Sequence, residues 1–153
     1  MKFLELKVPP VAVVIVYLGL MTFIAQRWPG YILILPKQEF IAILLVLMGI
    51  SIALLGVVSF KKARTTVNPT KPGNASSVVD SGIFRYTRNP MYLGMFLLIV
   101  GYAAELAALS SYFVALTFIL YMDQFQIKPE ERALEGLFGQ DYVNYKHKVR
   151  RWL

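Results

Sequence analysis

Long apolar runs constrain this chain more than any other feature, because they have the length of membrane-spanning helices. Residues 8–26 and 40–60 are each close to the roughly 20 residues that a helix needs to cross about 30 Å of hydrocarbon. The first run is too long for a removed signal peptide and lacks its small-residue cleavage pattern. With 57% hydrophobic and 16% charged residues, the composition also differs from that of a soluble domain.

A third apolar run, residues 90–127, is too long for one crossing. At about 1.5 Å per residue a single helix would extend well over 50 Å. We therefore expect the chain to reverse near 107–111 and to form two shorter helices, 90–107 and 111–127. The predicted fold is all-α: one domain, 1–153, that forms a polytopic membrane helical bundle of about four transmembrane helices.

Basic residues indicate the orientation of this bundle. Most of the Lys and Arg residues lie in the loop 61–89 and in the tail 128–153. An even number of crossings places both segments and the N-terminus on one side, and the positive charge makes that side the cytoplasm. The net charge of +7 flanks apolar runs, which favours a membrane surface and argues against a nucleic-acid partner.

The cytoplasmic tail is predicted to be helical. Pro129 in the first turn and Gly139 as a C-cap bound one helix, and a second is expected from Asp141. Helical spacing places Tyr142, Tyr145, Val149 and Trp152 on one stripe of that second helix. This stripe either lies on the membrane or folds back over a site.

Polar residues near the cytoplasmic end have two interpretations each. Glu130 and Glu131 either complement the dipole of the tail helix or belong to a site. Asp123 lies inside a short apolar helix, where an acid should face protein or a cavity. Arg88 is either an interfacial anchor or a site residue. The chain has no cysteine and one histidine, His147, so we predict no metal site.

Two motifs resemble those of a known family. Residues 82–94 read GIFRYTRNPMYLG, residues 130–145 read EERALEGLFGQDYVNY, and Arg151-Trp152 close the pattern. Together they resemble the isoprenylcysteine carboxyl methyltransferase and phospholipid methyltransferase family of integral membrane enzymes. The resemblance covers roughly residues 76–152, and its motifs occur in order across a helical hairpin.

The resemblance implies S-adenosylmethionine as cofactor, in a pocket between the cytoplasmic ends of the membrane helices and the tail. The residues that it implies for cofactor binding are Ser76, Ser77, Val78, Val79, Phe84, Asn89, Pro90, Met91, Tyr92 and Glu130. Aromatic faces and a carboxylate are suitable partners for a cationic sulfonium.

The candidate catalytic residues are Glu131, Asp123 and Arg88. A carboxylate or thiolate acceptor needs no base, whereas an amine must lose a proton, for which Glu131 or Asp123 is the nearest candidate. The family more often has His where this chain has Asn89. Relatives that methylate isoprenylcysteine carry an Arg shortly before the acidic pair, where this chain offers only Lys128.

The predicted function is methyl transfer from S-adenosylmethionine to a lipid or isoprenylated acceptor, with carboxyl methylation favoured over a phospholipid amine. The expected partners are the lipid bilayer and this lipophilic acceptor. The alternative is an NADPH-dependent membrane reductase of the sterol or enone type, which shares a similar Pro-x-Tyr motif. A third possibility is a membrane module without enzymatic activity.

Overall fold

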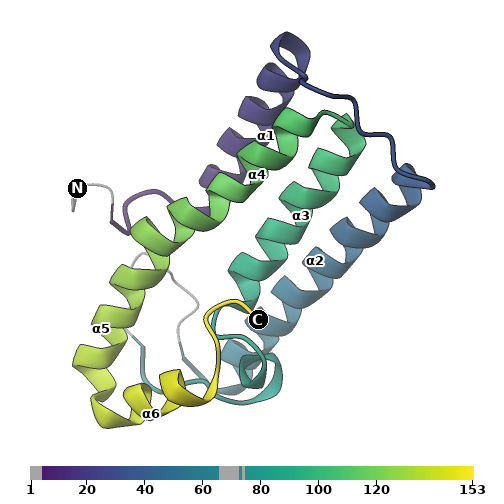
Figure 1. The fold of residues 1–153 in the computed structure, drawn as a ribbon. Helices are drawn as coiled ribbons and strands as arrows, with labels where there is room; N and C mark the ends of the chain where they lie inside the picture. Colours follow the sequence, from purple (N-terminus) through teal and green to yellow (C-terminus); the bar gives the residue numbers. More distant parts are fainter. Residues whose placement is uncertain (1–4, 66–72, 74) are drawn as a thin grey trace.

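The computed structural model describes residues 5–65, 73 and 75–153, and this part of the chain is helical. The helices are α1 (Pro10–Arg27), α2 (Gln38–Lys62), the 3-10 helix η3 (Gly82–Arg85), α3 (Pro90–Leu106), α4 (Leu109–Met122), the π-helix η4 (Asp123–Ile127), α5 (Lys128–Phe138) and α6 (Gln140–Lys148). Helices α1 to α4 lie side by side, and α5, α6 and η3 gather at one end of them (Figure 1).

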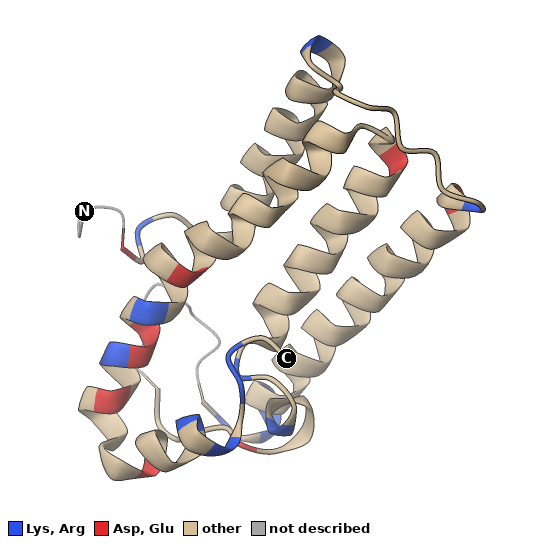
Figure 2. Cartoon of the chain, viewed as in Figure 1, with Lys and Arg blue, Asp and Glu red and all other residues tan. Residues whose placement is uncertain are grey.

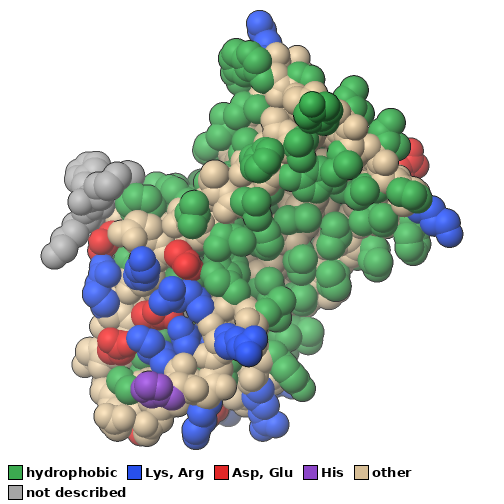
Figure 3. Space-filling model, in the orientation of Figure 1, with side chains coloured by type: hydrophobic (Ala, Val, Ile, Leu, Met, Phe, Trp, Pro, Cys, Tyr) green, Lys and Arg blue, Asp and Glu red, His purple; other side chains and the backbone are tan. Residues whose placement is uncertain are grey.

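The apolar helices match the sequence prediction in place and approximate length. Within the described residues, α1 and α2 are long and apolar enough to cross a membrane, and α3 is a shorter apolar helix of 17 residues. Their outward side chains form an apolar surface that ends where charged residues begin, around α5 and α6 (Figures 2 and 3). The boundary between these two surfaces is where a membrane interface is expected.

The reversal predicted for 107–111 occurs at Ala107 and Ala108. Ala107 adopts a left-handed backbone with φ of 52°, and α4 begins at Leu109. The α1–α2 connection supports this turn: the Leu33 N–H donates to Ala107 O at 2.7 Å, and the Leu109 N–H donates to Tyr31 O at 2.9 Å. The long third apolar run is therefore a helical hairpin.

Glycines let α2 and α3 pack almost backbone to backbone. A Cβ added at Gly49 would lie 2.6 Å from the Gly94 carbonyl oxygen, and one at Gly101 would lie 2.9 Å from that of Ala42. Small residues at such positions are the usual means of close helix approach in membranes. This contact places the start of α3 beside the end of α2.

Helix α4 continues through η4 into α5 without a break (Figure 1). Pro129 has no N–H to donate to the carbonyl of Phe125, four residues earlier. That oxygen instead accepts a hydrogen bond from the Leu6 N–H at 3.0 Å. The π-helix η4 ends at Ile127, shortly before the acidic pair, which lies in the first turn of α5.

The predicted stripe on the second tail helix is partly wrong. Helix α6 ends at Lys148, and Val149 is extended, so Trp152 does not continue the helix. The reason is Arg88, whose Nη1 donates to the carbonyl oxygens of Lys146 at 2.9 Å and Val149 at 2.7 Å. Tyr142 and Tyr145 are buried, which favours the alternative that the helix folds back over a site.

Candidate functional site

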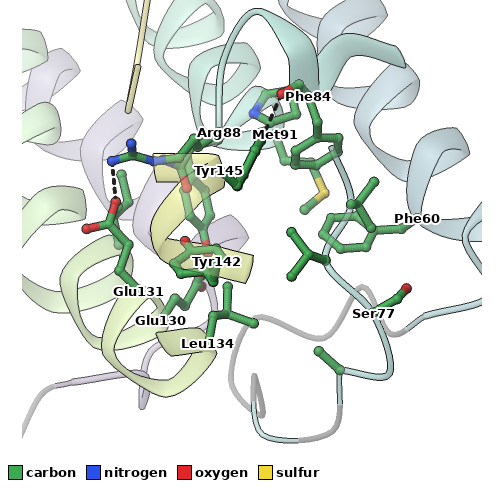
Figure 4. Close-up of a pocket in the computed structure, with 17 residues that line it drawn as sticks. Phe60, Ser77, Phe84, Arg88, Met91, Glu130, Glu131, Leu134, Tyr142 and Tyr145 are labelled. Atoms are coloured by element: carbon green, nitrogen blue, oxygen red, sulfur yellow. Dashed lines mark hydrogen bonds and ion pairs between the residues drawn. The ribbon is translucent and has the colours of Figure 1, made fainter. Parts of the chain in front are cut away.

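A hollow lies where the bundle meets α5 and α6. Side chains of α5 and α6 face those of the α2 end, η3 and α3 across it (Figure 4). The space free of protein atoms in and around it is about 820 Å³, part of which is open solvent at its mouth. The lining residues are Phe60, Ala75, Ser77, Val78, Val79, Phe84, Arg88, Asn89, Pro90, Met91, Tyr92, Ile127, Glu130, Glu131, Leu134, Tyr142 and Tyr145.

The η3 turn positions one wall of the hollow. Gly82 has φ of +61°, and a Cβ there would lie 2.8 Å from Ser59 Oγ, so glycine lets the turn pack against α2. The Phe84 ring packs edge-on against Phe60 with centroids 5.1 Å apart. The Tyr145 hydroxyl donates to Phe84 O at 2.8 Å and ties α6 to the same wall.

The Glu130 carboxyl lines the hollow and accepts a hydrogen bond from the Tyr92 hydroxyl. Within the described chain it forms no ion pair with a Lys or Arg. Burial raises the pKa of Glu130 to about 8, the Tyr92 hydrogen bond partly opposes this rise, and the charge of Glu131 adds to it. An acid without a counter-ion in such a place favours a cationic ligand.

Glu131, the next residue, has the opposite environment. Arg88 Nη2 lies 2.7 Å from its Oε1, and Arg151 donates to both oxygens at 3.1 and 2.7 Å. Burial alone would raise the pKa of Glu131, but the hydrogen bonds from Arg151 and Arg88 outweigh burial and hold the pKa below its ordinary value. Glu131 is therefore a carboxylate fixed by two guanidinium groups.

Most residues predicted for the site come together around the hollow. Ser76 and Asp123 are outside its lining. Ser76 is hydrogen-bonded to the segment that follows α2, with its N–H donating to Thr65 Oγ1 at 2.9 Å and its Oγ to Arg64 O at 3.3 Å. Asp123 accepts from Trp152 Nε1 at 3.0 Å and lies 3.5 Å from Arg151 Nη1.

Sequence reasoning missed part of the apolar wall. The residues not predicted as site residues are Phe60, Ala75, Ile127, Leu134, Tyr142 and Tyr145. Leu134, Tyr142 and Tyr145 carried a signal, since each lies within the tail motif of residues 130–145. Phe60 and Ala75 belong to no motif and reach the hollow only through the fold.

Comparison with known proteins gives a consistent result. The family model of phospholipid methyltransferases matches residues 38–141. An uncharacterized protein of Haemophilus influenzae is 43% identical over 63 residues, which is 41% of this chain and all of that protein. No solved structure matches the chain significantly.

The family match covers α2, the η3 turn, the helical hairpin and α5, which includes most of the hollow. It supports methyl transfer at a membrane and gives no support to the reductase alternative. The chain belongs to the phospholipid methyltransferase family, within the group of membrane methyltransferases that also contains the isoprenylcysteine enzymes.

Proposed function

We propose that this protein is an integral membrane methyltransferase that uses S-adenosylmethionine and methylates a lipophilic amine. The observation that carries the proposal is Glu130: it lines the hollow, hydrogen-bonds Tyr92, and has no cationic partner in the described chain. The adjacent Glu131 is already paired with two arginines. Glu130 is therefore the acid of the hollow that can pair with the cationic group of a bound molecule.

The residues present fit the proposed cofactor. S-adenosylmethionine would supply a methyl group on a cationic sulfonium, together with an amino-acid end that carries both charges. Glu130 would hold a cationic part, and the aromatic side chains Phe84 and Tyr92 are suitable neighbours for it. The buried Arg88 Nε has no hydrogen-bond partner in the described chain and is a donor available to a carboxylate.

The charges around the hollow favour an amine over the carboxylate that the sequence suggested. The ionisable groups of its described lining, apart from tyrosines, are Arg88, Glu130 and Glu131. Lys128, the candidate partner for a substrate carboxylate, is exposed and donates to Gln124 at 3.2 Å. Once Arg88 and Glu130 hold the cofactor, no cation of this lining remains for a second carboxylate.

An amine acceptor must lose a proton before it attacks the methyl group, and the predicted bases are poorly suited to take that proton. Glu131 and Asp123 are both bonded to Arg151, so their geometry suits anchoring better than proton abstraction. The hollow is walled largely by apolar side chains, such as Val79, Ile127 and Leu134. Burial disfavours the ammonium form, so these walls would help the amine arrive as the neutral nucleophile.

The proposed topology has four crossings, α1 to α4, with both termini and the site in the cytoplasm. Charged residues concentrate around α5, α6 and η3 (Figure 2), which matches the rule that basic segments stay inside. The acceptor would approach from the bilayer, and the soluble cofactor from the cytoplasm.

Calorimetry on the full chain in detergent tests the cofactor. We expect S-adenosylmethionine and S-adenosylhomocysteine to bind saturably and NADPH not to bind. Binding of NADPH together with no binding of S-adenosylmethionine or S-adenosylhomocysteine would overturn the proposal.

Transfer of labelled methyl groups to total lipid tests the acceptor class. An N-methyl product keeps its label in mild alkali, whereas a methyl ester releases labelled methanol. Alkali-stable label in the lipid fraction is expected. Volatile label would restore the carboxylate acceptor and leave the cofactor assignment intact.

A further inference from the structure

After α6 the chain continues as a non-helical segment, residues 149–152, which we name the tail strap. Its backbone lies against the start of α3. The Arg88 N–H donates to Arg150 O at 3.0 Å, Asn89 Nδ2 donates to Arg151 O at 2.9 Å, and Thr87 Oγ1 donates to the same oxygen at 3.3 Å. Asn89, where the family more often has His, thus holds the strap.

Side chains of the tail strap reach the other half of the site. Arg151 binds both oxygens of Glu131 and lies 3.5 Å from Asp123. Trp152 donates to Asp123 at 3.0 Å, and its ring packs against Phe96 with centroids 6.4 Å apart. The strap therefore connects α3 with the α4–α5 junction that carries the acidic pair.

Arg88 approaches Glu131 from the segment between η3 and α3, while Arg151 approaches it from the strap. The exposed fraction of the side chain is 9% for Arg88 and 7% for Glu131, so little solvent screens this contact. Glu130 and Glu131 are neighbours in the chain, and two unpaired carboxylates in one partly buried place would repel each other. In the described structure, both arginines pair with Glu131, and their charges offset this repulsion.

We propose that Arg151 and Arg88 are positioning residues that together fix and neutralise Glu131, so that Glu130 alone presents an unpaired carboxyl to the hollow. This inference rests on the proposed function, and it makes the tail strap a working part of the cofactor site. Neither arginine needs to touch the reacting methyl group for this role.

The inference predicts opposite effects of two substitutions on the ionisation of Glu130. The groups that face Glu130 are Tyr92 from α3, Tyr142 from α6, and Glu131 with the two arginines behind it. The charge of Glu131 raises the pKa of Glu130. Arg151→Met leaves Glu131 less neutralised and raises that pKa further, whereas Glu131→Gln removes the charge and lowers it.

The test measures S-adenosylmethionine affinity by calorimetry as a function of pH, in the full chain in detergent. The sulfonium prefers ionised Glu130, so affinity rises with pH until that acid is fully ionised. Relative to the unmodified chain, Arg151→Met should move the midpoint of this rise up, and Glu131→Gln should move it down, each by roughly half to one pH unit. Arg151→Lys should keep the midpoint and weaken binding by a few fold, because it keeps the charge but loses the forked contact.

Arg132→Met is the matched control, because Arg132 follows Glu131 directly but its side chain is 57% exposed and pairs with Glu5. It should leave the midpoint unchanged.

Equal losses of affinity in Arg151→Met and Glu131→Gln without opposite pH shifts would show that the strap is merely structural and would overturn the inference. If Arg151→Met does not fold, Glu131→Gln and Arg151→Lys still test the inference. An unchanged midpoint in Glu131→Gln would contradict an effect of the Glu131 charge on the ionisation of Glu130. If the unmodified chain does not bind the cofactor, the proposed function fails instead.

Discussion

Glu130 and Glu131 have the same side chain and adjacent positions, yet their surroundings give them different chemistry. Glu131 is held by Arg88 and Arg151, while Glu130 has only the Tyr92 hydroxyl within the described chain. Helical geometry points consecutive side chains in directions about 100° apart, so each acid meets a different set of neighbours. The motif contains two acids. Two arginines hold Glu131 in place, whereas Glu130 is the proposed binding partner of the cationic cofactor.

Removing the charge of Glu130 should weaken cofactor binding selectively. Glu130→Gln is expected to lower S-adenosylmethionine affinity by about 10- to 100-fold near pH 8.5, because a charge-assisted contact is lost. S-adenosylhomocysteine, which lacks the sulfonium charge, should lose less. Calorimetry with both ligands checks this, with Glu135→Gln as control, because Glu135 pairs with Lys146 of α6 and is not part of the lining of the hollow. Equal losses for both ligands would contradict a contact between Glu130 and the sulfonium.

The Tyr92 hydroxyl should set the pH at which the cofactor binds. Its hydrogen bond lowers the pKa of Glu130, so Tyr92→Phe raises that pKa above the value of about 8. The carboxylate that attracts a cation is present above this pKa and is lost as the pH falls through it. The pH at which S-adenosylmethionine affinity rises should therefore shift upward, with a loss of roughly 3- to 10-fold near pH 7.5. Tyr86→Phe, at a residue that is 72% exposed, should change neither quantity.

At the scale of elements, the contact between α2 and α3 decides whether the hollow forms. Phe60 and Met91 line it from the adjoining ends of these two helices. The helices approach closely at Gly49 and Gly94, where any side chain would enter the facing backbone. A change at this crossing should therefore alter both stability and the site.

Gly49→Ala tests that contact. The added Cβ would lie 2.6 Å from the Gly94 carbonyl oxygen, which is backbone and cannot rotate away. We expect a destabilisation of about 1–3 kcal/mol and a fall in Tm of several degrees in detergent. Gly19→Ala is the control, since nothing lies within 4 Å of a Cβ there and alanine favours a helix. Equal Tm values for the two variants would mean that α2 and α3 accommodate the added methyl group without a loss of stability.

At the scale of the whole molecule, charge separates the protein into an apolar bundle and a charged end (Figures 2 and 3). The chain contains no cysteine, so single introduced cysteines report topology without background. Tyr31 is 81% exposed in the α1–α2 connection, and His147 is exposed on α6.

A membrane-impermeant thiol reagent added to intact cells should label Tyr31→Cys and not His147→Cys. Inside-out vesicles should give the reverse pattern, because the proposed topology places α6 in the cytoplasm. Labelling of both positions from the same side would rule out an odd number of crossings between them, and with it this topology.

Much of the fold could be predicted because it follows local physical rules. The bounds of the apolar helices follow from hydrophobic length, and the reversal at Ala107 follows from a run too long for one crossing. The end of α5 at Gly139 follows from the backbone that glycine allows, with φ of +52°. The end of α6 was not predictable, because the carbonyls that stop it are taken by Arg88, about 60 residues earlier in the chain.

By itself, the sequence determined the solvent in which this protein folds, the helices, the family, and most residues of the hollow. The solvent and the helices follow from composition and periodicity, which are properties of neighbouring residues, whereas the family and the site residues follow from motifs that resemble those of known membrane methyltransferases. Only the tertiary structure decided that Arg88 and Arg151 both bind Glu131, that Asn89 holds the tail strap, and that Asp123 and Ser76 lie outside the lining. The physical reason is that pairing of charges depends on distance in space, and these groups approach one another only when α3, α5 and the end of the chain are folded together.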